Sequence, residues 1–120
     1  MANNYVKHGS LQHSDAILDK DKSVLVVIDI QEKIIPSIFN ADEVLANTAL
    51  LLEAAAILGI PVLATEQYSK GLGPTHAELQ LEDSIPVFEK SVFSALGTET
   101  ETEKGLFSKI KELGREQIVI

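Results

Sequence analysis

The sequence predicts an α/β fold built on a parallel sheet, and two observations support this prediction. Residues 23–29 (SVLVVID) contain consecutive aliphatic and β-branched side chains rather than an alternating pattern, which is typical of a strand covered on both faces. A helical pattern follows, and then a second apolar segment at 61–65. A strand, a helix and a strand in succession imply parallel pairing through a right-handed crossover. We therefore expect the first strand inside a parallel sheet with helices on both faces.

The helix between these strands is marked at both ends. Asn40 is a candidate N-cap with Glu43 as the third helical residue, Gly59 is expected to end the helix, and Pro61 prevents its continuation. Residues that recur at three- and four-residue steps predict its buried face: Val44, Leu45, Thr48, Leu51, Leu52, Ala55 and Leu58.

The rest of the chain predicts two more strands and one more helix. Residues 66–84 form a long glycine- and proline-containing loop, with one helical turn expected near 76–79. A strand is expected at 85–90, a helix at about 102–113 and a last strand at 117–120. The apolar face of that helix is predicted to be Leu106, Phe107, Ile110 and Leu113. The loop is longer than a connection needs, and such loops often line binding sites.

The predicted domain organisation is a polar N-terminal arm, 1–22, followed by one domain, 23–120. No helix follows the last strand to cover the new edge of the sheet, and an uncovered apolar edge promotes association. The chain is therefore expected to be the first part of a larger domain, truncated on its C-terminal side. The alternative is a complete chain whose last strand is protected by a partner.

Composition excludes several classes of function. Ten basic and 18 acidic residues give a net charge of −8, so nucleic acid is not an expected partner. There is no cysteine, and the first 23 residues lack the apolar core of a signal peptide. The longest apolar run, 48–58, is interrupted by Glu53 and too short to cross a bilayer. We expect a cytoplasmic protein that does not contact membranes.

Polar residues stand where three predicted strands end. Asp29 ends the first strand, 66–68 follow the second, and Lys90 ends the third. In an open parallel sheet these ends meet at one edge, where ligands bind. Asp29 alone could merely bond the amides of the next turn, and Lys90 alone would ordinarily be solvated. Together they predict a carboxylate–ammonium pair whose members keep each other ionised, with the carboxylate able to accept a proton.

Four further residues are candidates for substrate binding. Gln31 either holds Asp29 or its neighbouring loop, or is only a turn residue, and Gln67 is expected to line the pocket. Tyr68 either lines the pocket or packs its ring under the glycine-rich loop. Phe93 is either a pocket wall or part of the core.

Three segments resemble the isochorismatase-like cysteine hydrolases: VVIDIQEK, GIPVLATEQYSKGLGPT and PVFEKSVFSA, in that order. The resemblance covers residues 22–120. It implies a three-layer αβα sandwich with a parallel, Rossmann-like sheet, and an Asp–Lys–Cys catalytic triad. Asp29 and Lys90 match the aspartate and the lysine. The family cysteine stands shortly after the fourth strand, whereas this sequence ends at Ile120 before that position.

The implied activity is hydrolysis of a small amide or related C–N bond, with the cysteine lying beyond this chain. One branch of the family cleaves a vinyl ether without the cysteine. A non-catalytic module that pairs its last strand with a partner chain is the alternative. Family members commonly associate, so a homo-oligomer acting on a small-molecule substrate is expected.

No metal or cofactor is predicted. Nicotinamidases in the family bind zinc through a D-x-H segment and a second histidine, whereas the comparable stretch here holds only His76, which is expected on the surface. The GLG segment, 71–73, lacks the spacing of a phosphate or dinucleotide loop. The charged run at 99–104 is expected to be a solvated helix start.

Overall fold

The computed structural model describes residues 17–99 and 104–120. The strands are β1 (Ser23–Ile28), β2 (Val62–Gln67), β3 (Val87–Lys90) and β4 (Gln117–Val119). The helices are α2 (Ala41–Leu58), α3 (Ser69–Leu72) and α4 (Leu106–Leu113), and the short 3-10 turns are η2 (Ile35–Ser37), η3 (Ala77–Leu79) and η4 (Ala95–Thr98).

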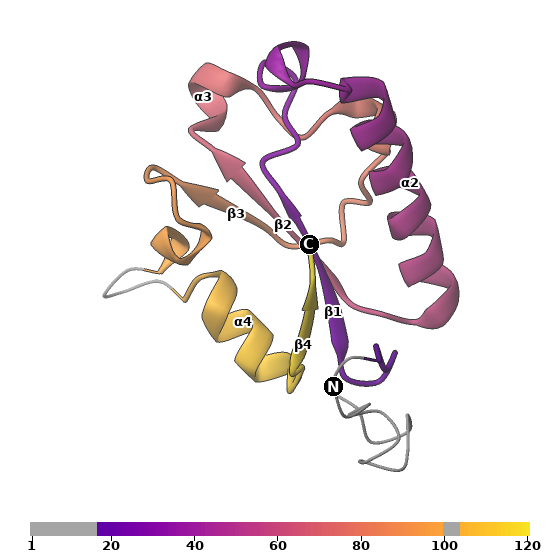
Figure 1. Cartoon of the computed structure of the whole chain (residues 1–120). Coiled ribbons are helices and arrows are strands. Elements are labelled where there is room, and N and C mark those ends of the chain that lie inside the picture. The colour runs from indigo at the N-terminus through magenta and orange to yellow at the C-terminus, as the bar shows by residue number, and fades with distance from the viewer. Residues whose placement is uncertain (1–16, 100–103) are drawn as a thin grey trace, which may run out of the picture.

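The four strands form one sheet in the order β3-β2-β1-β4, with every neighbouring pair parallel. The parallel sheet with an interior first strand, predicted from the sequence, is confirmed. Leu25 pairs with Val62 and Ile28 with Thr65, so β1 and β2 end at the same edge. In Figure 1 the segment after β1 and helix α3 both lie at the top, beyond the ends of their strands.

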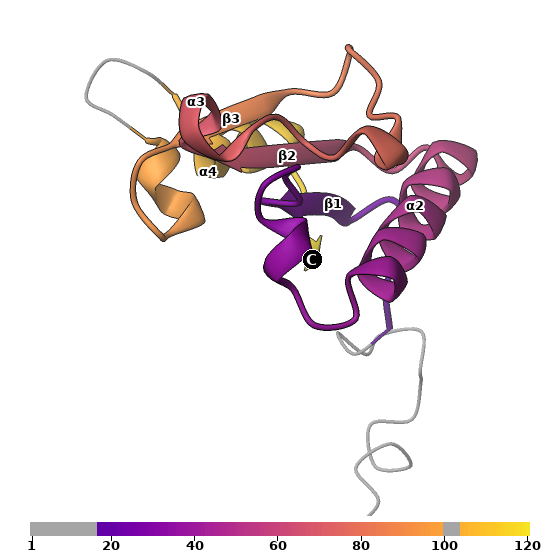
Figure 2. The ribbon, with the colours of Figure 1, turned by 90° about the horizontal axis from the view of Figure 1, so that it is seen from above.

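Helices cover both faces of the sheet, because alternate side chains of β1 point in opposite directions. Leu25 and Val27 pack in one core cluster with Leu45 and Ala55 of α2. The other face carries a second cluster, made of Val24, Val26, Leu63, Leu106 and Ile110. Figures 1 and 2 show α2 and α4 on opposite sides of the sheet. The three-layer αβα arrangement follows, and it places the polar strand ends between two apolar layers.

The predicted buried face of α2 is only partly correct. Leu45 and Ala55 are buried, but Leu51 and Leu58 are 41% and 49% exposed. The helix carries apolar residues on several sides, so their spacing alone does not select the side that packs on the sheet. The expected side-chain cap is also wrong: Asn40 makes no capping hydrogen bond and adopts a left-handed backbone conformation, with φ 55°. Gly59 ends the helix in the left-handed conformation, as predicted.

Several element boundaries differ from the predictions for a tertiary reason. β2 continues to Gln67 because Glu66 and Gln67 pair with Glu89 and Lys90 of β3. β3 begins at Val87 rather than residue 85, and α3 was not predicted. The helical turn expected near 76–79 is present as η3.

Helix α4 begins at Leu106, later than predicted, and part of the predicted start lies in 100–103, outside the described residues. Glu99 does not belong to the helix. Its carboxylate accepts hydrogen bonds from the backbone amides of Gly105 and Ser108 and from the Ser108 hydroxyl. The carboxylate thus satisfies amides at the start of the helix that have no partner within it. Phe107, predicted on the buried face, is 47% exposed.

Within residues 17–99 and 104–120, no helix combines the length and apolar character needed to span a bilayer.

Candidate active site

An ion pair lies at the carboxyl edge of the sheet. Asp29 directly follows β1, and Lys90 is the last residue of β3, two strands away. The Lys90 Nζ and the Asp29 Oδ2 are 2.6 Å apart. The Lys90 side chain is 1% exposed and that of Asp29 is 21% exposed. The pair therefore buries its positive member and leaves its carboxylate in partial contact with solvent.

The Lys90 ammonium is fully occupied by oxygen atoms of the protein. In addition to Asp29, it donates to the Gln67 side-chain oxygen at 2.7 Å. It also donates to the backbone oxygens of Phe93 at 3.0 Å and Val92 at 3.3 Å. An ammonium has three N–H donors, and four acceptors surround this one. The side chain is therefore held in one position and has no donor to spare.

Thr65 fixes the other oxygen of Asp29. Its hydroxyl donates to Asp29 Oδ1 at 2.8 Å, and the Asp29 amide donates to the Thr65 carbonyl at 3.1 Å. Asp29 has a left-handed backbone with φ 53°, as does Tyr68 with φ 36°. Such conformations cost energy in residues other than glycine and gather at functional sites. Here the left-handed turn follows directly on the strand that delivers the carboxylate to the pair.

Gln31 acts as a clamp on the neighbouring loop. Its side-chain oxygen accepts from the Gln67 amide at 2.6 Å. Its Nε2 donates to the carbonyls of Gln67 and Gly73, at 2.9 and 2.8 Å. The residue is fully buried. Of the two sequence interpretations, the loop-holding one matches this geometry. Its side-chain oxygen and nitrogen are both engaged with backbone, so the substrate-binding candidate Gln31 holds the loop in this structure.

Two glutamates hold the loop that follows β2. Glu66 accepts from the amide and the hydroxyl of Thr75, at 2.8 and 2.9 Å. Glu32 accepts from the Ala77 amide at 2.7 Å, and its other oxygen is 3.6 Å from His76 Nε2. The His76 side chain is 17% exposed, so the histidine expected on the surface is partly covered. Glu32 comes from the segment after β1, and its contacts tie the Ala77 amide and His76 of the loop to that segment.

A cavity of about 520 Å³ opens beside the ion pair. Asp29 and Gln67 supply its polar wall, and the remaining lining is apolar: Ile28, Ile30, Ile34, Ile35, Ile38, Val44 and Phe93. Clefts of this volume are typical of sites for small molecules. The carboxylate that Thr65 and Lys90 hold in place therefore faces a space large enough for a substrate.

The aromatic candidates lie in different places. The Phe93 side chain is 99% exposed and lines the cavity, so it is not part of the core. The Lys90 Nζ lies 5.9 Å from the centre of its ring. Tyr68 is 58% exposed and does not line the cavity. Its ring covers Gly71 so closely that a side chain at that position would collide with it.

Sequence reasoning missed one residue of the site, Thr65. It is 1% exposed and sits within an apolar strand, where a threonine is easily taken for a β-branched space filler. The available signal was the strand register, because Thr65 pairs with Ile28, the residue before Asp29. Among the residues that the structure describes, no three His, Asp or Glu side chains are grouped so that they could hold a metal ion.

Comparison with known proteins identifies the family. The model of the isochorismatase domain matches residues 23–120, which is most of the chain. The chain belongs to the isochorismatase family. Isochorismatase domain-containing protein 2 of Danio rerio is 46% identical over 98 residues, which cover 82% of this chain and 46% of that protein. The chain spans less than half the length of this curated relative.

Solved structures of isochorismatase-family proteins share the fold. An isochorismatase family protein from Burkholderia thailandensis superposes with a TM-score of 0.67 at 20% identity, over 84% of this chain and 63% of that one. The MAR1 ribonuclease of Caenorhabditis elegans has 39% identity and a TM-score of 0.59, over 62% of this chain and 40% of that one. The predictions of family and fold class are confirmed.

Proposed function

We propose that the protein is a hydrolase of small amides or related C–N bonds, in which Asp29 is the general base. The observation that carries the proposal is the Asp29–Lys90 pair, because it fixes a partly exposed carboxylate at the wall of a cavity. One oxygen is held by Lys90 and the other by Thr65. A carboxylate offers about four lone-pair positions, so it can accept a further proton while keeping both contacts.

The proposed nucleophile is a cysteine beyond residue 120, in the position that family members use. Its thiol proton passes to Asp29 while the sulfur attacks the carbonyl carbon. The C–N bond then breaks, and the leaving amine takes the proton from Asp29. Water attacks the resulting thioester and gives one proton to Asp29, which returns it to the departing thiolate. Lys90 orients the carboxylate throughout and balances its charge.

The relation to a ribonuclease does not lead us to propose RNA as the substrate. The net charge of the chain is −8, and the cavity walls are mainly isoleucine. A polyanion is bound through cationic side chains. The Lys90 ammonium beside this cavity is already committed to Asp29 and to three other oxygens.

Asp29→Asn tests the proposal, in a protein that includes the proposed cysteine beyond residue 120. The amide keeps the shape of the side chain but cannot accept the proton, so turnover should fall on the order of 10²–10⁴-fold. Lys90 keeps three of its oxygen acceptors, so the protein should remain folded. Turnover is measured as ammonia release from a panel of primary amides, and folding by circular dichroism.

Asp21→Asn is the matched control, because this aspartate is 78% exposed and lies before β1, at the opposite end of the strand. It should retain full turnover. Ammonia release by Asp29→Asn at the rate of the unaltered protein would contradict the proposal, as would no hydrolysis of any amide in the panel.

A further inference from the structure

The walls of the cavity carry information about the substrate, and this inference rests on the function proposed above. Five isoleucines, from the end of β1 and the segment that follows it, join Val44 and Phe93 around the space: Ile28, Ile30, Ile34, Ile35 and Ile38. Aliphatic and aromatic walls favour ligand groups that leave water easily. A charged group placed among them would lose its hydration without gaining a partner, which is costly.

Charge near the cavity disfavours anions in particular. Asp29 is the one charged residue among those that line the space, within the part of the chain that the structure describes. Lys90 lies behind it with its donors committed to protein oxygens. Among the described residues, a substrate carboxylate would therefore meet a carboxylate and find no available ammonium. These walls select against an acidic substrate.

Gln67 supplies a donor suited to a neutral carbonyl. Its side-chain oxygen must face Lys90, because an ammonium can only donate. The amide nitrogen Nε2 consequently points away from Lys90, and within the described residues it donates to no protein group. Every buried side-chain nitrogen in these residues has a hydrogen-bond partner, so the Gln67 Nε2 is not buried. Gln67 also lines the cavity. Its NH₂ group is thus accessible and can donate to a ligand oxygen.

From these three observations we infer that the substrate is an uncharged amide whose acyl group is branched aliphatic or aromatic. The acyl group lies against the isoleucines and Phe93, and the carbonyl region lies near Gln67 and Asp29. Acids and amides that bear a further carboxylate are excluded. The inference thus narrows small amides in general to neutral, apolar ones.

Benzamide and benzoate are matched probes, since they share size and shape but differ in charge at neutral pH. Titration calorimetry on the intact protein should show benzamide binding about tenfold or more tightly than benzoate, because the acid loses hydration without an available cation. Equal or tighter binding of benzoate would overturn the inference. Failure of both probes to bind up to their solubility limits would overturn it as well.

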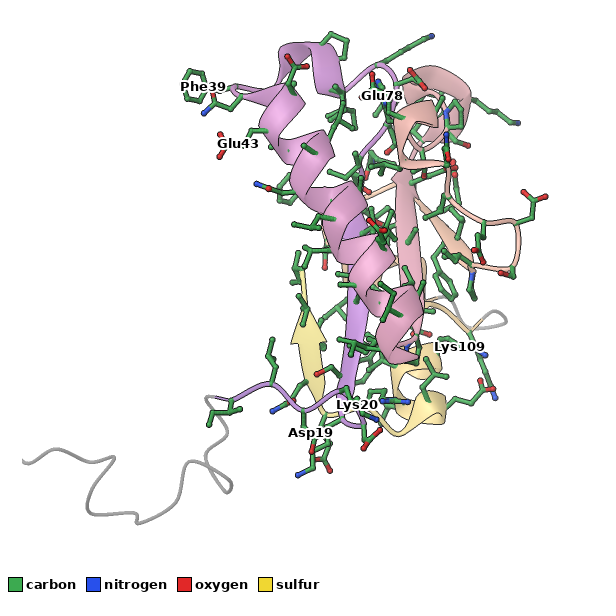
Figure 3. The ribbon with its side chains drawn as sticks, turned by 90° about the vertical axis from the view of Figure 1, so that its right-hand side faces the viewer. Asp19, Lys20, Phe39, Glu43, Glu78 and Lys109 are labelled. Atoms are coloured by element: carbon green, nitrogen blue, oxygen red, sulfur yellow. The ribbon has the colours of Figure 1, made fainter. Side chains whose placement is uncertain are left out.

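Two substitutions that introduce a lysine test whether the preference for benzamide over benzoate arises in the cavity. Ile38 lines the space and is 41% exposed, so Ile38→Lys adds a cation there without opening the core. This variant should lose the preference for benzamide through tighter binding of benzoate. Phe39, the next residue, is 87% exposed, does not line the cavity and points away from the body of the molecule (Figure 3). Phe39→Lys adds the same charge and should keep the preference. An equal shift in both variants would show a general charge effect and contradict the inference.

The outcomes separate this inference from the proposed function. A benzamide preference that Ile38→Lys removes, together with normal turnover in Asp29→Asn, would leave the cavity assignment standing and defeat the assignment of Asp29 as general base. An essential Asp29 together with a preference for benzoate would leave the hydrolase and defeat the substrate class.

Discussion

Two polar clusters lie side by side at the carboxyl edge of the sheet and are used differently. The ion-pair cluster consists of Asp29, Thr65, Lys90 and the Gln67 side chain. The Gln31 clamp consists of the Gln31 side chain and the backbone of Gln67 and Gly73. Both are well bonded, but only the first presents a carboxylate to the cavity. Burial and complete hydrogen bonding therefore do not identify a reactive group, whereas a fixed and still accessible oxygen does.

The Gln31 clamp should act on stability, and Gln31→Leu should have the largest effect on the free energy of unfolding. The substitution leaves the amide and carbonyl of Gln67 and the carbonyl of Gly73 without partners. An unsatisfied buried polar group costs about 1–3 kcal/mol, so the free energy of unfolding should fall by about 3 kcal/mol or more. Urea denaturation of the intact protein measures it.

Asn47→Leu is the control for that experiment, because it also replaces a side-chain amide by leucine, but at an exposed position. It should change the free energy of unfolding by less than about 0.5 kcal/mol. If Gln31→Leu instead lost turnover with its stability unchanged, the clamp would belong to the reactive cluster and the distinction between the two would fail.

Thr65 should affect turnover more than its contribution to folding suggests. Thr65→Val keeps the β-branched shape and removes the hydroxyl that donates to Asp29 Oδ1. Stability should fall by about 1 kcal/mol, the usual contribution of one hydrogen bond. The rate constant kcat should fall about tenfold, because the carboxylate loses one of its two fixed oxygens.

Thr65→Ser separates positioning from packing, since it keeps the hydroxyl and loses a methyl group. It should be less stable than the unaltered protein but retain most of kcat, with KM unchanged in both variants. A serine variant as slow as the valine variant would show that Thr65 serves the core and does not position Asp29.

The Glu99 carboxylate bonds backbone amides, as the Gln31 clamp does, and does not face the cavity. Its substitution should have the smallest effect on stability. The backbone amides of Gly105 and Ser108 hold the pKa of the Glu99 carboxyl below its ordinary value. A lowered folded-state pKa means that the ionised group contributes stability above its unfolded pKa and loses it as pH falls through the folded one. Glu99→Gln should therefore lower the melting temperature at neutral pH and leave turnover unchanged.

The same variant should differ less and less from the unaltered protein as the pH is lowered into the acid range, where Glu99 itself becomes protonated. Melting curves at a series of pH values measure this, with Glu116→Gln at an exposed position as the control. A pH-independent difference between the two proteins would show that the charge of Glu99 does not contribute.

The sequence by itself determined that the sheet is parallel and that Asp29 and Lys90 stand at the same edge of it. The uninterrupted apolar run at 24–28 and the helix between the first two strands indicate a parallel sheet, because a short turn cannot join parallel strands. Strand ends in such a sheet share an edge, so Asp29 and Lys90 were predicted close together although 61 positions (90 − 29) separate them. Their spacing of 2.6 Å agrees with that prediction.

Only the tertiary structure decided what the remaining polar residues do. Gln31 and Gln67 have the same side chain, and both follow or end an apolar strand, yet one is buried against backbone and the other lines the cavity. Likewise, the spacing in α2 did not reveal that Leu51 would be exposed, nor did β-branching reveal that Thr65 would hold Asp29. The physical reason is that local patterns set periodicity and strand ends. The partner of each hydrogen bond and the side of each helix that packs depend on segments distant in the chain, which meet only in the folded protein.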